Sequence, residues 1–165
     1  MNILLVGCTG FLGQALLFKL LRDTKHKIIL AIRPKNNKDI EIRLKEMLDS
    51  IRLDCNKYLN RITPILVNYD DERNIIISEE DDKYLKNNVE ILVNALADVH
   101  INREIRKATL NNTVTALKWM QKFHECKKGS LYLYISTAFV NFHRLEHGEV
   151  PEEILERNMN HSNLE

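Results

Sequence analysis

The sequence lacks an excess of charge of either sign and any long hydrophobic run. Its 24 lysines and arginines stand against 23 aspartates and glutamates, which leaves a formal net charge of +1. No global field therefore attracts nucleic acid or an anionic membrane. The longest apolar stretch near the start, 3–6, runs straight into a glycine-rich turn, which fits neither a secretory signal nor a membrane span. We expect no nucleic-acid partner, no targeting signal and no membrane segment in this chain.

The sequence also lacks the cysteine pattern of a disulfide framework or a zinc site. Cys8, Cys55 and Cys126 are odd in number and show no CxxC spacing, which favours free thiols in a reducing compartment. His143 and His147 have the i, i+4 spacing of a helical metal pair, but no third ligand is evident nearby. We predict that the chain binds no metal.

What the sequence does contain is a regular alternation of two hydrophobic periods. Of its 165 residues, 44% are hydrophobic and 28% are charged, which is enough apolar material for the core of one globular domain. Short apolar runs typical of buried strands alternate with stretches in which apolar residues recur at helical spacing. Strands are expected over 3–6, 28–32, 62–67, 89–95 and 131–135, and helices over 11–22, 40–51, 78–85 and 102–124.

This order of elements predicts an α/β fold. Strands separated by helices suit right-handed crossovers, so we expect a Rossmann-like, doubly wound parallel sheet with helices on both faces. The pattern becomes polar after Asn141. We therefore expect a nucleotide-binding domain over 1–141, with a sheet that is incomplete at its C-terminal end. We expect 142–165 to be a polar tail at the start of a missing substrate-binding region.

A glycine-rich turn follows the first expected strand and opens the first expected helix. Gly7, Gly10 and Gly13 have the spacing GxxGxxG. In this context Gly7 permits the sharp turn, Gly10 lets the backbone approach a pyrophosphate, and Gly13 allows close packing of the helix on the sheet. The free N–H groups of the first helical turn favour the negative phosphates. The turn therefore predicts dinucleotide binding.

The end of the second expected strand bears on the choice of cofactor. An NAD site would offer an aspartate or glutamate there to the ribose hydroxyls, but this chain has Arg33, with Lys35 close by. A guanidinium cannot accept those hydrogen bonds, whereas its forked donors match a 2′-phosphate. The pair favours NADP over NAD, and the alternative is that both are ordinary solvated charges on a loop.

Several motifs of the chain resemble one family of reductases. The segments VGCTGFLG, AIRPKNNKDIEIRL, VNALADVHIN, ATLNNTVTAL and YISTAFVN occur in the order and spacing of alcohol-forming fatty acyl-CoA reductases, which are extended short-chain dehydrogenases/reductases. The resemblance covers nearly the whole chain and implies NADPH as cofactor and a fatty acyl-CoA as substrate. The terminal domains of carboxylic acid reductases are similar enough to remain an alternative.

The resemblance also implies roles for individual residues. Thr137 corresponds to the catalytic hydroxyl that binds the substrate carbonyl, Ser136 is its neighbour, and Asn111 matches an asparagine of the family's long helix. A hydroxyl suits that position because a reduced carbonyl develops negative charge on oxygen. Asp70 would accept from the adenine amino group. The full set of residues implied at the cofactor is Gly7, Thr9, Gly10, Phe11, Leu12, Gly13, Arg33, Lys35, Asp70 and Ala97.

The chain departs from the family pattern at several positions. Tyr69, Leu96 and Val114 stand where the family has smaller residues, and no tyrosine is followed four residues later by lysine, although the reductases it resembles complete their site with a Tyr-x-x-x-Lys pair. We therefore expect a fragment, an incomplete gene model or a degenerate paralogue that is inactive alone. The alternative is a non-catalytic NADP-binding sensor or scaffold. The parent enzyme is expected in the cytoplasm or on the cytosolic face of an organelle membrane, and no oligomeric state is predicted.

Overall fold

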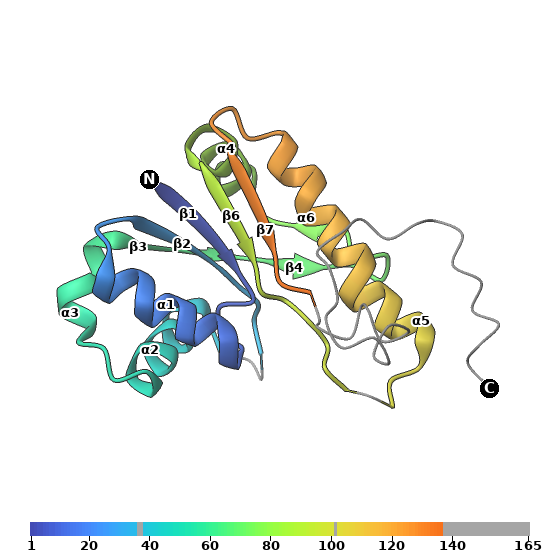
Figure 1. Cartoon of the computed structure of the whole chain (residues 1–165), viewed down its shortest axis with the longest axis horizontal. Helices are drawn as coiled ribbons and strands as arrows, with labels where there is room; N and C mark the ends of the chain where they lie inside the picture. The colour runs from blue at the N-terminus through green and yellow to red at the C-terminus, as the bar shows by residue number, and fades with distance from the viewer. Residues whose placement is uncertain (36–37, 101, 137–165) are drawn as a thin grey trace, which may run out of the picture. The chain divides into compact units, whose positions relative to one another are not determined.

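A computed structural model describes residues 1–35, 38–100 and 102–136, with the backbone alone for residues 55 and 56. Within it, Met1–Ile135 form one compact unit. Its main sheet is parallel throughout and has the strand order β3-β2-β1-β6-β7 (Figure 1). The five strands are β1 (Asn2–Val6), β2 (Lys27–Ile32), β3 (Ile62–Leu66), β6 (Ile91–Asn94) and β7 (Leu131–Tyr134).

Helices cover both faces of this sheet, as the alternating pattern predicts. They are α1 (Phe11–Asp23), α2 (Ile40–Ser50), α3 (Cys55–Tyr58), η1 (Leu59–Arg61), α4 (Glu79–Asn88), α5 (Ile105–Ala108), η2 (Thr109–Val114) and α6 (Thr115–His124). Side chains of α1 and α2 pack on one face, and those of α4 and α6 pack on the other. The predicted doubly wound fold is confirmed.

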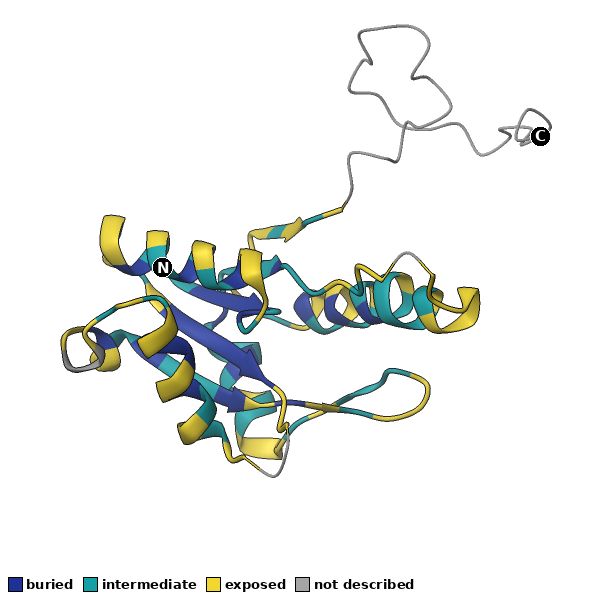
Figure 2. Cartoon of the chain, turned by 90° about the horizontal axis from the view of Figure 1, so that it is seen from below, coloured by how far each residue is buried: buried dark blue, intermediate teal, exposed yellow. Residues whose placement is uncertain are grey.

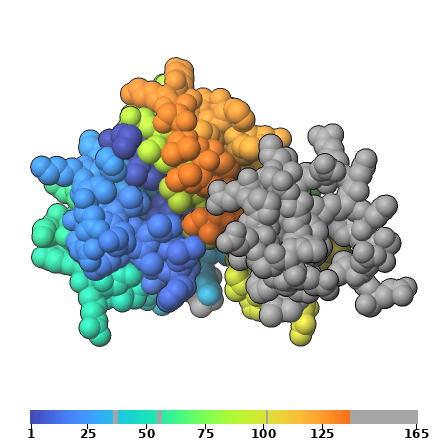
Figure 3. Space-filling view, in the orientation of Figure 1, coloured from blue at the N-terminus to red at the C-terminus, as the bar shows by residue number. Residues whose placement is uncertain are grey.

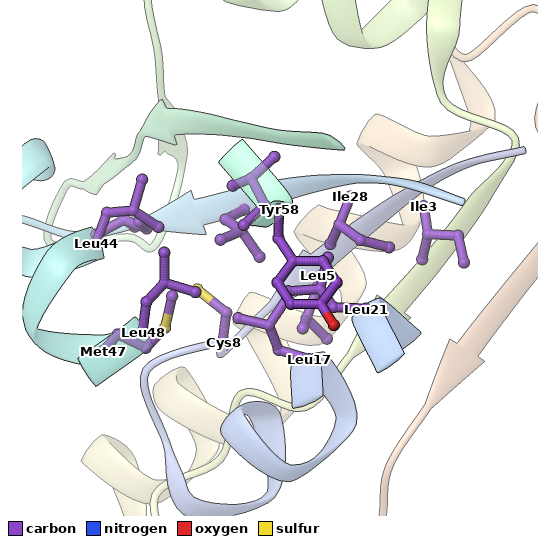
Figure 4. Close-up of a cluster of buried hydrophobic side chains, with 13 residues drawn as sticks. Ile3, Leu5, Cys8, Leu17, Leu21, Ile28, Leu44, Met47, Leu48 and Tyr58 are labelled. Carbon is purple, nitrogen blue, oxygen red and sulfur yellow. The ribbon is translucent and has the colours of Figure 1, made fainter. Parts of the chain in front are cut away.

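The two cores follow from the alternation of side chains along the strands. Leu5 points into the first core with Leu17, Leu21 and Leu48 (Figure 4), whereas the preceding Leu4 belongs to the second core with Trp119, Phe123 and Leu85. Neighbouring strand residues face opposite sides of a sheet, so the central strands are buried on both faces, as Figure 2 shows. Trp119 and Phe123 are thus packing residues of the second core.

Strand β7 differs from the central strands. Leu131 and Leu133 are each 45% exposed, and the residues of β7, drawn in orange, reach the surface in Figure 3. Tyr132 faces the other side, where its ring meets Phe123 and its hydroxyl donates to the carbonyl oxygen of Ala116. Within the described residues, β7 is therefore an edge strand that is covered on one face only.

Several element boundaries differ from the sequence expectation. The long helix begins at Ile105 and not at residue 102, because the preceding loop is held by the side chain of Asp98. It also contains a π-helical segment, η2, between α5 and α6. A two-stranded antiparallel hairpin, β4 (Asn68–Tyr69) and β5 (Ile75–Ile76), follows β3, where no element was predicted.

Candidate cofactor site

The turn after β1 lies where the strand order reverses, between β1 and β6. Gly7 has φ +81°, and a Cβ there would lie 2.6 Å from the backbone of Ala95 and Leu96. A Cβ on Gly13 would overlap the carbonyl group of Gly7. Main chain therefore packs directly on main chain at both positions, which requires glycine. Ligands of doubly wound sheets bind at such a reversal, outside the carboxyl ends of the strands.

Gly10 is different, because the fold itself leaves room for a side chain there. The nearest atom to a Cβ built on Gly10 is the carbonyl oxygen of Gly7, at an ordinary 3.4 Å. Gly10 is the N-cap of α1, and no side chain caps the helix. Phe11, the first helical residue, is 95% exposed. The helix thus begins at an open surface with backbone N–H groups available to an anion.

Cys8, in the same turn, is buried and hydrogen-bonded to β2. The residue is fully buried and its thiol donates to the carbonyl oxygen of Ala31, at 3.5 Å. Burial raises the pKa of the thiol to about 12, against a smaller opposing effect of the Arg43 charge. The thiol is therefore neutral and inert, and it packs the turn against β2. Thr9, the next residue, accepts from the side chain of Gln14 through its carbonyl oxygen, at 3.2 Å.

The loop after β2 presents the two cations predicted at the adenosine phosphate. Arg33 and Lys35 are both exposed. The carbonyl oxygen of Arg33 accepts a hydrogen bond from the guanidinium of Arg43, so α2 holds this loop. Both side chains are accessible to a ligand, and their assignment to a 2′-phosphate stays a prediction.

The hairpin after β3 is fastened by Asp70. One carboxylate oxygen accepts from the backbone N–H groups of Glu72 and Asn74, at 3.0 and 2.8 Å, and the other accepts from the side-chain amide of Asn74, at 2.8 Å. The hydrogen bonds from Asn74 lower the pKa of Asp70. Both oxygens are therefore engaged in the turn, and the role of Asp70 as an acceptor for adenine stays a prediction.

Tyr69 ties this hairpin to the second core. Its hydroxyl accepts from the indole N–H of Trp119, at 2.9 Å. Burial raises the pKa of Tyr69, while the hydrogen bond from Trp119 and the charges of Arg33 and Arg73 oppose that rise. Tyr69 thus has a packing partner in α6 that sequence reasoning did not anticipate.

A polar cluster that sequence reasoning missed follows β6. Asp98 has a side chain only 9% exposed, and its carboxylate accepts from Arg103 at 2.7 Å, His100 at 2.6 Å and the amide of Asn111 at 2.9 Å. These partners, His100 first, hold the pKa of Asp98 well below its usual range. Asn112 bonds both the backbone N–H and the carbonyl oxygen of the same aspartate, at 2.7 and 3.1 Å.

The cluster defines the surroundings of two predicted site residues. Both asparagines come from η2, so the π-helical segment brings them to the loop after β6 together. The amide of Asn111 is oriented by Asp98, and its catalytic role stays a prediction. Ala97 is exposed beside Leu96, whose N–H donates to the side chain of Asn94 at 3.1 Å.

The remaining predicted site residues lie at the end of the described chain. Ser136 is exposed and follows β7 by two residues. Thr137, His143, His147 and the predicted boundary at 141 lie outside the described residues. Within the described residues no group of three or more metal-binding side chains occurs, and no helix there has the length and hydrophobicity of a membrane span.

Residues 5–165 match the profile of a family described as male sterility protein. The chain is 30% identical to mouse fatty acyl-CoA reductase 2 over 147 residues, which covers 85% of this chain and 28% of that protein. It is 27% identical to human fatty acyl-CoA reductase 1 over 157 residues, which covers 90% of this chain and 30% of that protein. The chain therefore spans less than a third of the length of these relatives.

Two solved reductase domains share the architecture. The terminal R domain of the myxalamid biosynthetic pathway superposes with a TM-score of 0.67 and 25% identity, over 82% of this chain and 34% of that one. A thiolation-reductase di-domain from an archaeal non-ribosomal peptide synthetase gives a TM-score of 0.69 and 23% identity, over 84% and 36%. The second likeness is one of fold alone.

Proposed function

This chain belongs to the male sterility protein family, and on that premise we propose that it is the cofactor-binding part of an NADPH-dependent reductase acting on a fatty acyl-CoA. The observation that carries the proposal is the contrast among three glycines. Packing requires Gly7 and Gly13, whereas among the residues that the structure describes nothing requires Gly10 to lack a side chain. Open space at an uncapped helix N-terminus, on the edge where doubly wound sheets bind ligands, suits a pyrophosphate.

NADPH is favoured over NADH by the charges beyond β2. Arg33 and Lys35 are exposed next to the end of that strand, and no carboxylate follows Ile32 directly to accept from the ribose hydroxyls. Two cations suit a 2′-phosphate, which carries a double negative charge near neutral pH. Arg43 holds the loop through the carbonyl oxygen of Arg33, and Arg33 itself is exposed.

The acyl-CoA substrate is proposed from the names of the relatives in mouse and human. A bound nicotinamide supplies the hydride for such a reduction. The chain would bind and orient the cofactor through the glycine turn, and the hydroxyl of Thr137, beside Ser136, would donate a hydrogen bond to the substrate carbonyl. Asn111, held by Asp98, would act near the same edge. Free Cys8 and Cys126 suit the reducing cytoplasm that we propose as the location.

Titration calorimetry of the 165-residue chain with NADPH and NADH tests the proposal. We expect NADPH to bind roughly tenfold or more tightly than NADH, the effect of one charge-assisted phosphate contact. Gly10→Val should abolish binding of both cofactors while the circular dichroism of the helices is retained, because the valine fills space that only a ligand uses. Arg33→Asp should remove the preference for NADPH.

A matched control for the charge change is Lys128→Asp. Lys128 is exposed and precedes β7, at the opposite edge of the sheet, so this variant should bind NADPH like the unmutated chain. Equal affinity for the two cofactors would exclude the NADP assignment, and normal binding by Gly10→Val would show that the glycine turn is only structural. The substrate is tested by NADPH oxidation with a long-chain acyl-CoA once a Tyr-x-x-x-Lys segment is joined to the chain.

A further inference from the structure

Two non-glycine residues in the described part of the chain have a left-handed backbone, and both are arginines. Arg52 has φ +53° and Arg73 has φ +64°. Arg73 lies in the turn of the hairpin β4–β5, where its N–H donates to the carbonyl oxygen of Asp70 at 3.1 Å. A side chain with a Cβ is sterically disfavoured in this conformation, and hairpin turns usually place glycine or asparagine there. The turn would form more easily without this arginine.

The side-chain hydrogen bonds that close the hairpin do not come from Arg73. Its Nε atom is buried and has no hydrogen-bond partner, and the guanidinium forms no ion pair with any described residue. The turn is closed by Asp70, Glu72 and Asn74 without it. A buried donor left without a partner is unfavourable, so two unfavourable features coincide at one residue.

The segment that carries Arg73 begins beside the end of β2, the strand that precedes Arg33. The N–H of Val67, just before the hairpin, donates to the carbonyl oxygen of Ile32 at 2.9 Å, which places the start of the hairpin beside the end of β2. Tyr69 lies in β4, and the charges of Arg33 and Arg73 both oppose the rise of its pKa that burial causes. Two guanidinium groups, from the segments after β2 and after β3, thus act on the same hydroxyl.

We infer that Arg73 is a second arginine for the phosphate on the adenosine of the dinucleotide, and that with Arg33 it selects NADPH over NADH. A phosphate monoester offers acceptor oxygens to two forked donors at once. Binding would then account for an arginine at a position where glycine suits the backbone better. The inference rests on the proposed binding of NADPH.

The test separates the backbone from the side chain with a matched pair of variants. Arg73→Gly and Arg52→Gly each remove one left-handed arginine, so neither should lower the melting temperature of the chain. In titration calorimetry, Arg73→Gly should weaken NADPH binding roughly tenfold or more and leave NADH binding unchanged. Arg52→Gly should change neither affinity. Arg73→Gln, which keeps the left-handed side chain but removes the charge, should show the same loss as Arg73→Gly.

The outcomes distinguish this inference from the proposed function. If Arg33→Asp weakens NADPH binding and Arg73→Gly does not, the role of Arg73 is refuted while NADPH binding stands. Equal loss of NADPH and NADH affinity in Arg73→Gly would show a structural role for the hairpin and would also refute it. If the unmutated chain binds neither cofactor, or both equally, the proposed function and this inference fail together.

Discussion

The turn after β1 and the hairpin after β3 lie at the same edge of the sheet, yet their backbones are held by opposite means. The glycine turn packs main chain on main chain, so that a Cβ at Gly7 or Gly13 would overlap backbone atoms. The hairpin is held by side chains, through the hydrogen bonds of Asp70 and the contact of Tyr69 with Trp119. Close backbone packing demands one residue type, whereas side-chain fastening can use many. The first kind of turn can therefore be recognised in a sequence, and the second cannot.

The largest effect is expected where the backbone packing is broken. Gly13→Val would push a branched side chain against the carbonyl group of Gly7, which cannot move without displacing β1. We expect the free energy of unfolding to fall by more than about 3 kcal/mol, measured by urea denaturation. Gly10→Ala, in the same turn but with ordinary 3.4 Å contact, should fold normally. An unchanged unfolding midpoint for Gly13→Val would contradict the backbone account of this turn.

An intermediate effect on the free energy of unfolding is expected at alkaline pH, where the buried thiol of Cys8 would ionise. The pKa of Cys8 rises from 9.0 to about 12 on folding because the thiol is buried. Stability is therefore full below pH 9, where the unfolded thiol is also neutral, and falls as the pH rises towards 12. The loss should reach about 1.4 kcal/mol between pH 8 and pH 10.

Cys8→Ala provides the comparison for this prediction. The variant has no thiol in the turn, so its free energy of unfolding should lack that part of the alkaline decline, whatever its starting value at pH 8. Urea titrations of both proteins at pH 8, 9 and 10 give the two slopes. Parallel slopes would mean that the turn tolerates a thiolate and that Cys8 is not buried as tightly as described.

The smallest effect is expected at acid pH, in the hairpin. The hydrogen bonds from Asn74 lower the pKa of Asp70, so its contribution to stability is present above the ordinary carboxyl pKa and is lost as the pH falls through the lowered value. Asp70→Asn should melt at a lower temperature than the unmutated chain at pH 7, and the gap should narrow at pH 3. Asp71→Asn, which changes an exposed neighbour, should show no such gap. A gap of equal size at both pH values would mean that the charge of Asp70 is not what holds the turn.

The sequence was sufficient to predict the strands and helices whose apolar residues recur at a regular spacing. The central strands and the helices that flank them were predicted within a few residues, because their buried side chains repeat at two or at about four residues. The hairpin β4–β5 was missed. Its strands are two residues long, too short for any period, and their pairing depends on Asp70 and on the distant Trp119.

The candidate site likewise contains one part that sequence spacing reveals and one part that only the fold brings together. Gly7, Gly10 and Gly13 could be identified because a glycine-rich turn between a strand and a helix has a fixed spacing. The cluster around Asp98 could not, because its partners Asn111 and Asn112 lie 13 and 14 residues away and reach the aspartate only through the π-helical segment. A pair of adjacent asparagines inside an otherwise helical stretch was the one available signal.

The π-helical segment is a place where the chain can lose one residue without disturbing the core. A π-helical turn holds one residue more than an α-helical turn, so deleting a residue from Thr109–Val114 should restore α-helical bonding without rotating the helix on either side. Trp119 and Phe123 would stay on the core face, while one of the two asparagines would lose its place beside Asp98. A chain that is one residue shorter within 109–114 should therefore keep this core.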